Sequence, residues 1–283
     1  MKPSRLPTVV VPVFNALAVT RQCLAALDRC SPDARVIIVN DASTEPGLLP
    51  LLRDWVARHP DQHLIDLPQN RGFVHAANRG AAEAEGDLVL LNSDAEVTPG
   101  WLDALGRCLA SDRAIATATP WSNNAEIVSL PEFCQANPVP ADADVWAAAV
   151  LATARGDYPE LPTGVGFCMA IAGTAIQELG LFDEAAFGRG YGEENDFCFR
   201  ARKAGWRNVL CEDAYVVHHG GQSFGPIGLR PDESSMQRLL AKHPDYLEQV
   251  SQWIERDPLA ARRAEVLAYR AAHGSGKLTA STP

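Results

Sequence analysis

The feature that most constrains this fold is a set of three apolar runs, each ending abruptly in polar residues. The runs are Thr8–Val13 (TVVVPV), Arg35–Val39 (RVIIV) and Leu88–Leu91 (LVLL), and the residues after them are Phe14-Asn15, Asn40-Asp41-Ala42-Ser43 and Asn92-Ser93-Asp94. Segments with helical spacing, such as 19–30 and 73–84, separate the runs. Strands that alternate with helices predict βαβ units and a parallel sheet. Right-handed crossovers then bring the three polar clusters to one edge, over one crevice.

Further elements are expected along the chain. The spacing of apolar residues predicts helices at 48–58, 101–109, 144–153, 174–179 and 195–204, and strands at 63–67, 114–119, 167–172, 209–211 and 214–218. Thr98 is expected to be an N-cap, with Pro99 at the first helical position. A long loop is expected at 120–140. Residues 230–272 are expected to be helical, with breaks at Pro231, Pro244 and Pro258.

Composition excludes several kinds of partner. The formal net charge of −10 argues against nucleic acid. No stretch approaches the roughly 20 apolar residues of a membrane span, and the apolar run after Pro7 is too short for a signal peptide. The seven cysteines form no CxxC pair, which favours reduced thiols and a cytoplasmic protein. Arg262, Arg263 and Arg270 allow at most peripheral contact with the inner face of a membrane.

Three positions carry side chains suited to chemistry. A carboxylate at Asp94 can hold a divalent cation, which can hold a diphosphate, although such an acid can also simply begin a turn. Glu193 and Glu194 stand near a predicted helix start, where the helix dipole favours an ionised general base; helix capping is the alternative. His218 ends a short strand and is a candidate metal ligand, with a structural role as the alternative.

The order of these motifs resembles that of the inverting glycosyltransferases of family 2, in particular the rhamnosyltransferase-like and O-antigen biosynthesis members. The motifs are VVVPVFNA, VNDAS, NRGF followed by NRG, LLNSDAEVTPGWL, PTGVGFCMAI, FDE-AFG-GYGEENDFCFRARKAGW and VVHHGGQSF, between Pro7 and Phe224. The resemblance implies a GT-A fold, an α/β architecture with a Rossmann-like, mostly parallel central sheet flanked by helices. We expect the GT-A domain at 1–228, a C-terminal helical extension at 229–272 and a disordered tail at 273–283.

The resemblance also implies a role for each matching residue. Those expected to hold the nucleotide and the donor are Pro12, Asn15, Asp41, Arg71, Asn78, Asn92, Ser93 and Asp94. Asp94 and His218 would bind Mn²⁺ or Mg²⁺, although Asn92 replaces the first acid of the family's DxD motif. Glu194 stands where the family has the Asp that deprotonates the acceptor, with Glu193 as a rival. Gly166, Phe167 and Asp196 are expected at the sugar and acceptor pocket.

The implied activity is metal-dependent, inverting transfer of a hexosyl or deoxyhexosyl group from a nucleotide-diphosphate sugar. The acceptor would be a hydroxyl of a glycan, lipid-linked or protein-linked molecule in bacterial glycan synthesis. Asp41 suits a pyrimidine N–H, which favours UDP or dTDP. A nucleotidyltransferase or a dehydrogenase would need a Gly-rich phosphate loop after the first strand, and VPVFNALAV has none. The remaining alternative is a non-catalytic sugar-nucleotide-binding relative.

Overall fold

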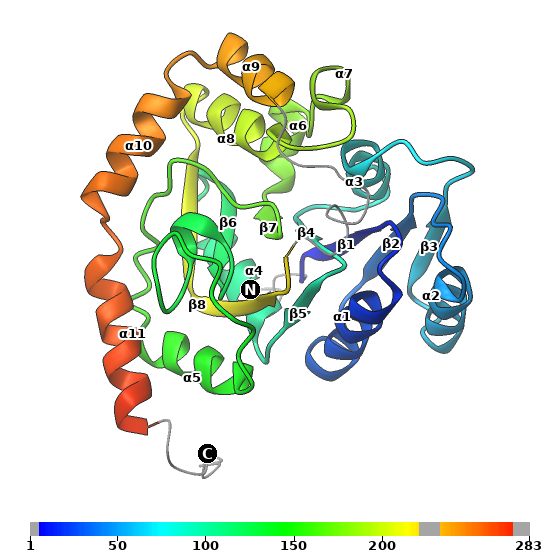
Figure 1. Cartoon of the computed structure of the whole chain (residues 1–283), viewed down its shortest axis with the longest axis horizontal. Helices are drawn as coiled ribbons and strands as arrows, with labels where there is room; N and C mark the ends of the chain where they lie inside the picture. The colour runs from blue at the N-terminus through cyan, green and yellow to red at the C-terminus, as the bar shows by residue number, and fades with distance from the viewer. Residues whose placement is uncertain (1–5, 221–232, 274–283) are drawn as a thin grey trace.

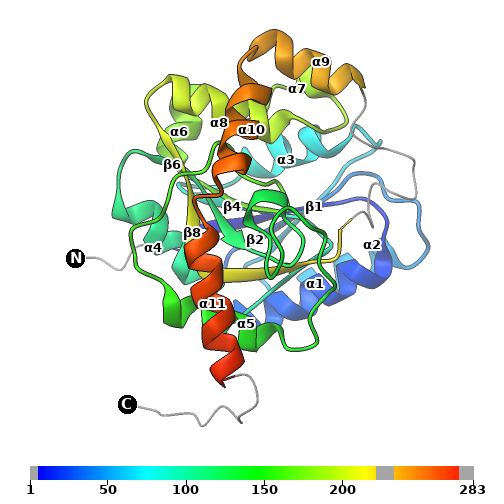
Figure 2. The ribbon, with the colours of Figure 1, turned by 60° about the vertical axis from the view of Figure 1, so that its left-hand side comes forward.

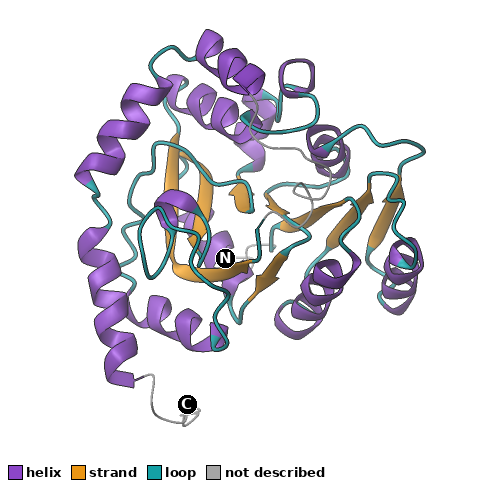
Figure 3. Ribbon diagram, in the orientation of Figure 1, coloured by secondary structure: helices purple, strands orange, loops and turns teal. Residues whose placement is uncertain are grey.

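An eight-stranded sheet runs through the centre of the protein (Figure 1). The computed structural model describes residues 6–220 and 233–273. The strand order is β3 (His63–Asp66), β2 (Val36–Asn40), β1 (Thr8–Val13), β4 (Leu88–Leu91), β7 (Cys168–Ile171), β6 (Ile115–Trp121), β8 (Arg207–His218) and β5 (Ala95–Val97). Helices surround these strands (Figure 3). The structure therefore has the α/β architecture that the sequence predicts.

The parallel half of the sheet consists of β3, β2, β1 and β4. Val10 of β1 pairs with Ile37 on one side and with Leu90 on the other, and both pairings are parallel. β1, β2 and β4 are buried along their whole length, as expected for parallel strands with helices on both faces. The prediction that these three strands end at one edge is confirmed.

The other half of the sheet is mixed. β7 runs antiparallel to both β4 and β6, whereas β6 and β8 are parallel. The short strand β5, which the sequence analysis did not predict, pairs antiparallel with the end of β8. The two strands predicted at 209–211 and 214–218 are one continuous strand. Of the two acids between them, Glu212 is buried and accepts hydrogen bonds from the backbone N–H groups of Arg155 and Gly156.

The helices that follow the strands are mostly those expected. They are α1 (Leu17–Cys30), α2 (Leu48–Arg58), α3 (Phe73–Ala81), α4 (Trp101–Ser111), the 3₁₀ turn η1 (Glu126–Val128), α5 (Ala143–Thr153), α6 (Gly173–Leu179), α7 (Glu184–Phe187) and α8 (Glu193–Lys203). Helix α3 packs closely on the sheet because Gly80 has no side chain; a Cβ there would lie 2.3 Å from Val10 Cγ1.

Two helix starts differ from the prediction. Thr98 is not the N-cap of α4, because Gly100 occupies that position and the Thr98 hydroxyl donates to the Tyr215 carbonyl. The strand β5 explains this difference: it ends at Val97, so Thr98 directly follows a strand and α4 begins only at Trp101. Helix α8 begins at Glu193, two residues before the predicted start, so Glu193 and Glu194 both lie in its first turn.

Three C-terminal helices run along one side of the molecule (Figure 2): α9 (Glu233–Lys242), α10 (Tyr246–Arg256) and α11 (Ala260–His273). The predicted breaks at Pro244 and Pro258 are confirmed, whereas Pro231 lies outside the described residues. The same holds for the predicted tail, apart from His273.

The arginines of α11 hold that helix to the rest of the protein. Arg262 pairs with Asp157 at 2.8 Å and Arg270 pairs with Asp142. Arg263 forms an ion pair with Asp257. Within residues 6–220 and 233–273, no helix is both long enough and apolar enough to cross a membrane.

Candidate active site

One pocket of about 190 Å³ opens beside the carboxyl end of β4 and joins the two halves of the sheet. It is lined by Phe73, Asn92, Asp94, Gly166, Phe167, Tyr191, Glu193, Glu194 and His218. All of these except Phe73 and Tyr191 are residues that the sequence singles out. The structure therefore brings together motifs from the loop after β4, the segment before β7, the start of α8 and the end of β8.

The sheet itself places Asp94 beside His218. Asp94 lies between β4 and β5, and the first residue of β5, Ala95, pairs with His218 at the end of β8. The Asp94 carbonyl also accepts a hydrogen bond from the His219 backbone N–H at 3.0 Å. The His219 ring instead forms an ion pair with Glu96, so His218 is the histidine that lines the pocket.

Hydrogen bonds fix both the position and the tautomer of His218. The Asn123 side chain accepts from the His218 backbone N–H at 2.9 Å and donates to the His218 carbonyl at 3.0 Å. His218 Nδ1 lies 2.6 Å from the Asn124 carbonyl, so Nδ1 carries the hydrogen. The Phe167 ring stacks on the imidazole at 5.0 Å between centroids. Nε2 is left with a lone pair that faces Asp94.

This arrangement fits a divalent cation. His218 Nε2 lies 3.5 Å from Asp94 Oδ1, and two acceptors that face each other in this way are stabilised by a cation between them. Two ligands at about 2.1 Å from one ion and at a right angle would lie roughly 3 Å apart. Among the described residues, no group of three or more His, Cys, Asp or Glu side chains could hold a metal. Such ions often keep waters and bind substrate phosphates, so a two-residue protein ligand set is sufficient.

The opposite wall of the pocket carries two glutamates from the first turn of α8. Glu193 is 6% exposed, and one of its oxygens, Oε2, has no hydrogen-bond partner among the described residues. Glu194 is less buried and lies against Gly166, where a Cβ would stand 3.7 Å from Glu194 Cγ. A side chain at position 166 would therefore narrow the space around Glu194.

Burial dominates the electrostatics of this wall. It raises the pKa of Glu194 to about 7, and the charge of Glu126 adds to the shift, although backbone N–H groups of the helix start oppose it. Burial and the neighbouring Glu194 raise the pKa of Glu193 well above its usual range. The sequence analysis expected the helix dipole to favour the ionised form of these acids. Burial outweighs that effect and raises both pKa values. A carboxylate with a pKa near 7 is suited to general-base catalysis at neutral pH.

Several residues expected to bind the nucleotide hold the loops at the strand ends together. Asn15 Oδ1 accepts from the backbone N–H groups of Thr44 and Glu45 at 2.8 and 3.0 Å. Asp41 is 2% exposed, and its two oxygens accept from the N–H groups of Arg71 and Gly72, both at 2.8 Å.

Three further members of that set are a strand residue, a buried serine and a surface arginine. Pro12 lies within β1 opposite Val39, and Ser93 is 2% exposed. The Arg71 guanidinium pairs with Glu184 at 2.7 Å. None of these three residues is among those that line the described pocket.

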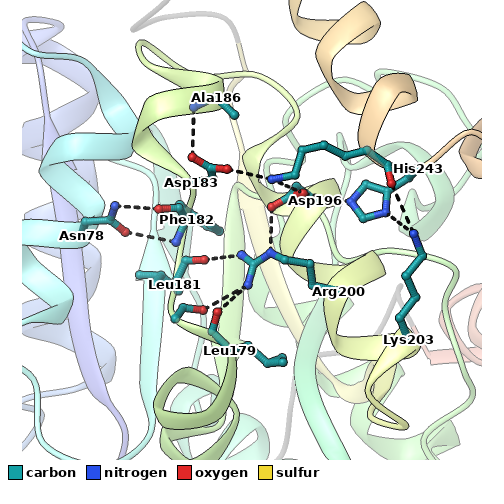
Figure 4. Close-up of polar contacts among 12 residues, drawn as sticks. Asn78, Leu179, Leu181, Phe182, Asp183, Ala186, Asp196, Arg200, Lys203 and His243 are labelled. Atoms are coloured by element: carbon teal, nitrogen blue, oxygen red, sulfur yellow. Dashed lines mark hydrogen bonds and ion pairs between the residues drawn. The ribbon is translucent and has the colours of Figure 1, made fainter.

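Two predicted site residues are absent from the pocket lining and contact other parts of the protein (Figure 4). The Asn78 amide donates to the Phe182 carbonyl at 3.0 Å and accepts from the Phe182 N–H at 3.2 Å, which ties α3 to the loop before α7. Asp196 is fully buried, forms ion pairs with Arg200 and Lys242, both at 2.8 Å, and is hydrogen-bonded to His243 at 2.9 Å. Helix geometry explains why Asp196 does not line the pocket beside Glu194, because the two residues lie about 200° apart around α8.

The sequence analysis missed the two aromatic residues of the pocket. Phe73 begins α3, and its backbone N–H donates to the Arg189 carbonyl at 3.2 Å, which brings it to the α8 side. Tyr191 has a positive φ of 71°, an uncommon conformation for a residue other than glycine. Its position between Gly190 and Gly192 is the only sequence signal for a tight turn there.

A comparison with protein families identifies the first part of the chain. Residues 8–137 match the model of the family described as glycosyl transferase family 2. This part of the chain belongs to family 2. The family 2 match includes Asp41 and Asp94 but ends before the segments that carry Glu194 and His218.

Known glycosyltransferases resemble the chain over more of its length. It is 25% identical over 227 residues to the low-salt glycan biosynthesis hexosyltransferase Agl10 of Haloferax volcanii. The aligned region covers 75% of this chain and 66% of that protein. The structure of GalNAc-T7 with UDP, GalNAc and Mn²⁺ superimposes with a TM-score of 0.65 at 13% identity, over 95% of this chain and 55% of the other.

A second solved structure supports the same fold. The mannosyltransferase PcManGT from Pyrobaculum calidifontis, in complex with GDP-Man and Mn²⁺, gives a TM-score of 0.55 at 20% identity, over 96% of this chain and 76% of that one. These likenesses identify the fold of the chain as GT-A. The chain spans about two thirds of the length of the hexosyltransferase and about half of the GalNAc-T7 chain.

Proposed function

We propose that this protein is a metal-dependent, inverting glycosyltransferase. It would move a sugar from a nucleotide-diphosphate donor to a hydroxyl of a glycan, lipid-linked or protein-linked acceptor in bacterial glycan synthesis. The observation that carries the proposal is the pocket in which Asp94 and His218 form one wall and Glu194 another. A pair of metal ligands and a carboxylate with a pKa near 7 are the two groups that such a transfer requires.

Each wall has a distinct task in this reaction. Asp94 and His218 would hold Mn²⁺ or Mg²⁺, which supplies charge neutralisation for the diphosphate leaving group. Glu194 would accept the proton of the acceptor hydroxyl as that oxygen attacks the anomeric carbon. Attack from the side opposite the leaving group occurs in one displacement, so the anomeric configuration inverts. Asn92 and Phe167 would shape the space between the two walls.

The donor base and the location are further parts of the proposal. We favour UDP or dTDP, because each Asp41 oxygen keeps a second lone pair beyond the single backbone N–H it accepts. We place the reaction in the cytoplasm, at most in peripheral contact with the membrane. All seven cysteines are free thiols, which is the usual state in a reducing compartment.

A donor panel with a base variant tests the proposal. UDP-, dTDP- and GDP-linked sugars would be incubated with the protein and Mn²⁺, and nucleotide release and sugar transfer would be measured. Glu194→Gln should lower kcat by about 10²–10⁴-fold with donor affinity nearly unchanged. Glu178→Gln, an exposed acid on α6, is the matched control. Full activity of Glu194→Gln, or retained configuration at the anomeric carbon by NMR, would refute the mechanism.

The same assay separates the proposal from the alternative of a non-catalytic binding protein. Calorimetric titration with nucleoside diphosphates measures binding independently of turnover. Tight binding with no turnover of any donor in the panel would support the binding protein. Loss of activity in Glu193→Gln with an active Glu194→Gln would instead assign the base to Glu193, the more deeply buried of the pair.

A further inference from the structure

We propose that Asn195 and Thr163 form a positioning relay that orients the Glu194 carboxylate and leaves its Oε2 atom to accept the proton. The inference rests on the proposed function, since it assigns roles to residues around the proposed base. Neither residue lines the pocket, and the resemblance assigns no role to either, although both lie within motifs that carry it.

Two hydrogen bonds connect the three side chains. Asn195 Nδ2 donates to Glu194 Oε1 at 3.0 Å, and Thr163 Oγ1 donates to Asn195 Oδ1 at 2.8 Å. The hydroxyl fixes the amide orientation, because a donor at Oδ1 requires the amide N–H₂ group to face Glu194. A longer contact of 3.2 Å joins the same hydroxyl to the Gly164 carbonyl. Oε1 is thereby occupied by a donor.

The loop that carries Thr163 is itself held in place. The Gly164 N–H donates to Cys198 Sγ at 3.1 Å, and the Val165 N–H donates to Thr119 Oγ1 at 3.3 Å. A Cβ at Gly164 would lie 2.7 Å from Met169 Sδ, so a larger residue there would have to displace the Met169 side chain of β7. Thr163 is 6% exposed. The start of the relay is therefore anchored on two strands and on α8.

The same loop continues into the pocket wall. Gly166 and Phe167, three and four residues after Thr163, line the pocket next to Glu194. The relay thus links the orientation of the proposed base to the loop that faces the acceptor side. A donor on Oε1 also favours the ionised carboxylate over the protonated one.

The surroundings of Glu194 make this donor important. Five titratable groups interact electrostatically with Glu194. They are Glu126 of η1, Tyr191 just before α8, Glu193 and Cys198 of α8, and Tyr246 of α10. None of these side chains carries a positive charge. Asn195 therefore supplies a polar contact that the neighbouring acids and phenols do not replace when the carboxylate is ionised.

Variants at the two ends of the relay test the proposal. Asn195→Leu removes the donor to Oε1, so the acidic inflection of the kcat–pH profile should move up by about one unit, and kcat at pH 6 should fall about tenfold. Thr163→Val, which leaves the amide unanchored, should lower kcat at that pH about threefold. Thr163→Ser keeps the hydroxyl and should restore the wild-type profile. Thr153→Val on α5, whose hydroxyl donates to Ala149, is the matched control.

Each outcome decides the proposal. Donor affinity by calorimetry should stay within twofold of wild type in all these variants. An unchanged inflection in Asn195→Leu, or equal losses in Thr163→Val and Thr163→Ser, would overturn the relay. Thermal melting checks the fold, and if Asn195→Leu is unfolded, Asn195→Asp, which cannot donate, must raise the inflection instead. An inactive wild type or a fully active Glu194→Gln would overturn the proposed function itself, whereas a failure confined to the relay variants would not.

Discussion

The buried carboxylate of Asp196 connects the helix that carries Glu194 to the C-terminal helices. Its side chain is fully buried, forms ion pairs with Arg200 and Lys242 that both measure 2.8 Å, and accepts a hydrogen bond from His243 at 2.9 Å. Lys203 Nζ lies 2.9 Å from His243 Nδ1, so that nitrogen accepts and Nε2 donates to Asp196. Asp196→Asn keeps the shape but removes the charge that Arg200 and Lys242 require.

The expected cost follows from the exposure of those partners. Removing one member of a buried pair destabilises by about 3–5 kcal/mol, because the remaining charge is left uncompensated. The side chains of Arg200 and Lys242 are 24% and 32% exposed, so water can partly replace the lost partner. We therefore expect a loss of about 3 kcal/mol, near the lower end of that range.

Urea unfolding at neutral pH measures this loss. Lys242→Met removes one partly exposed partner and should cost about 1 kcal/mol. Asp157→Asn should cost less than about 0.5 kcal/mol, because the Asp157 side chain is 60% exposed and Arg262 keeps its pair with Glu212. An Asp196→Asn variant within 1 kcal/mol of the wild-type stability would refute the reasoning. So would a Lys242→Met variant that loses as much as Asp196→Asn, because the effect would then belong to the lysine.

Two further predictions concern pH and metal. Because the pKa of Glu194 is raised to about 7 and a base acts when deprotonated, kcat should rise about tenfold from pH 6 to pH 8, and a flat profile over that range would contradict the assignment. A chelator should abolish transfer and added Mn²⁺ or Mg²⁺ should restore it, whereas Asp94→Ala should show weakened Mn²⁺ binding by calorimetry; full activity in chelator would remove the metal from the mechanism.

The sequence predicted the parallel half of the sheet because buried parallel strands are recognisable as short, continuous apolar runs. The same reasoning could not give the direction of β7. The run CMAI has no feature that distinguishes a parallel from an antiparallel neighbour, and its pairing with β4 depends on the whole topology. The strand β5 is only three residues long, and Glu96 within it interrupts the apolar pattern.

The site was predicted where local chemistry and position coincide. Asp94 and His218 end strands at the same edge, and Glu194 begins a helix, so their meeting in one pocket follows from the topology. Asn78 and Asp196 differ, because their partners are Phe182 and His243, about 100 and 47 positions away along the chain. A polar side chain does not reveal from the sequence alone whether it faces a ligand or a distant part of its own protein.

The pairing of β4 with β7 has a consequence for how such a protein can be re-engineered. The residues proposed to serve the donor come from the first hundred positions, except for His218, and those proposed to face the acceptor come from 163–196. These two segments meet through a short antiparallel ladder from Leu88 with Ile171 to Leu91 with Cys168, and through the hydrogen bond from Asn92 to the Phe167 carbonyl. The backbone forms that ladder, and it depends little on which side chains point into the pocket. Recombination between relatives at this seam could therefore exchange acceptor segments while the donor half stays in register.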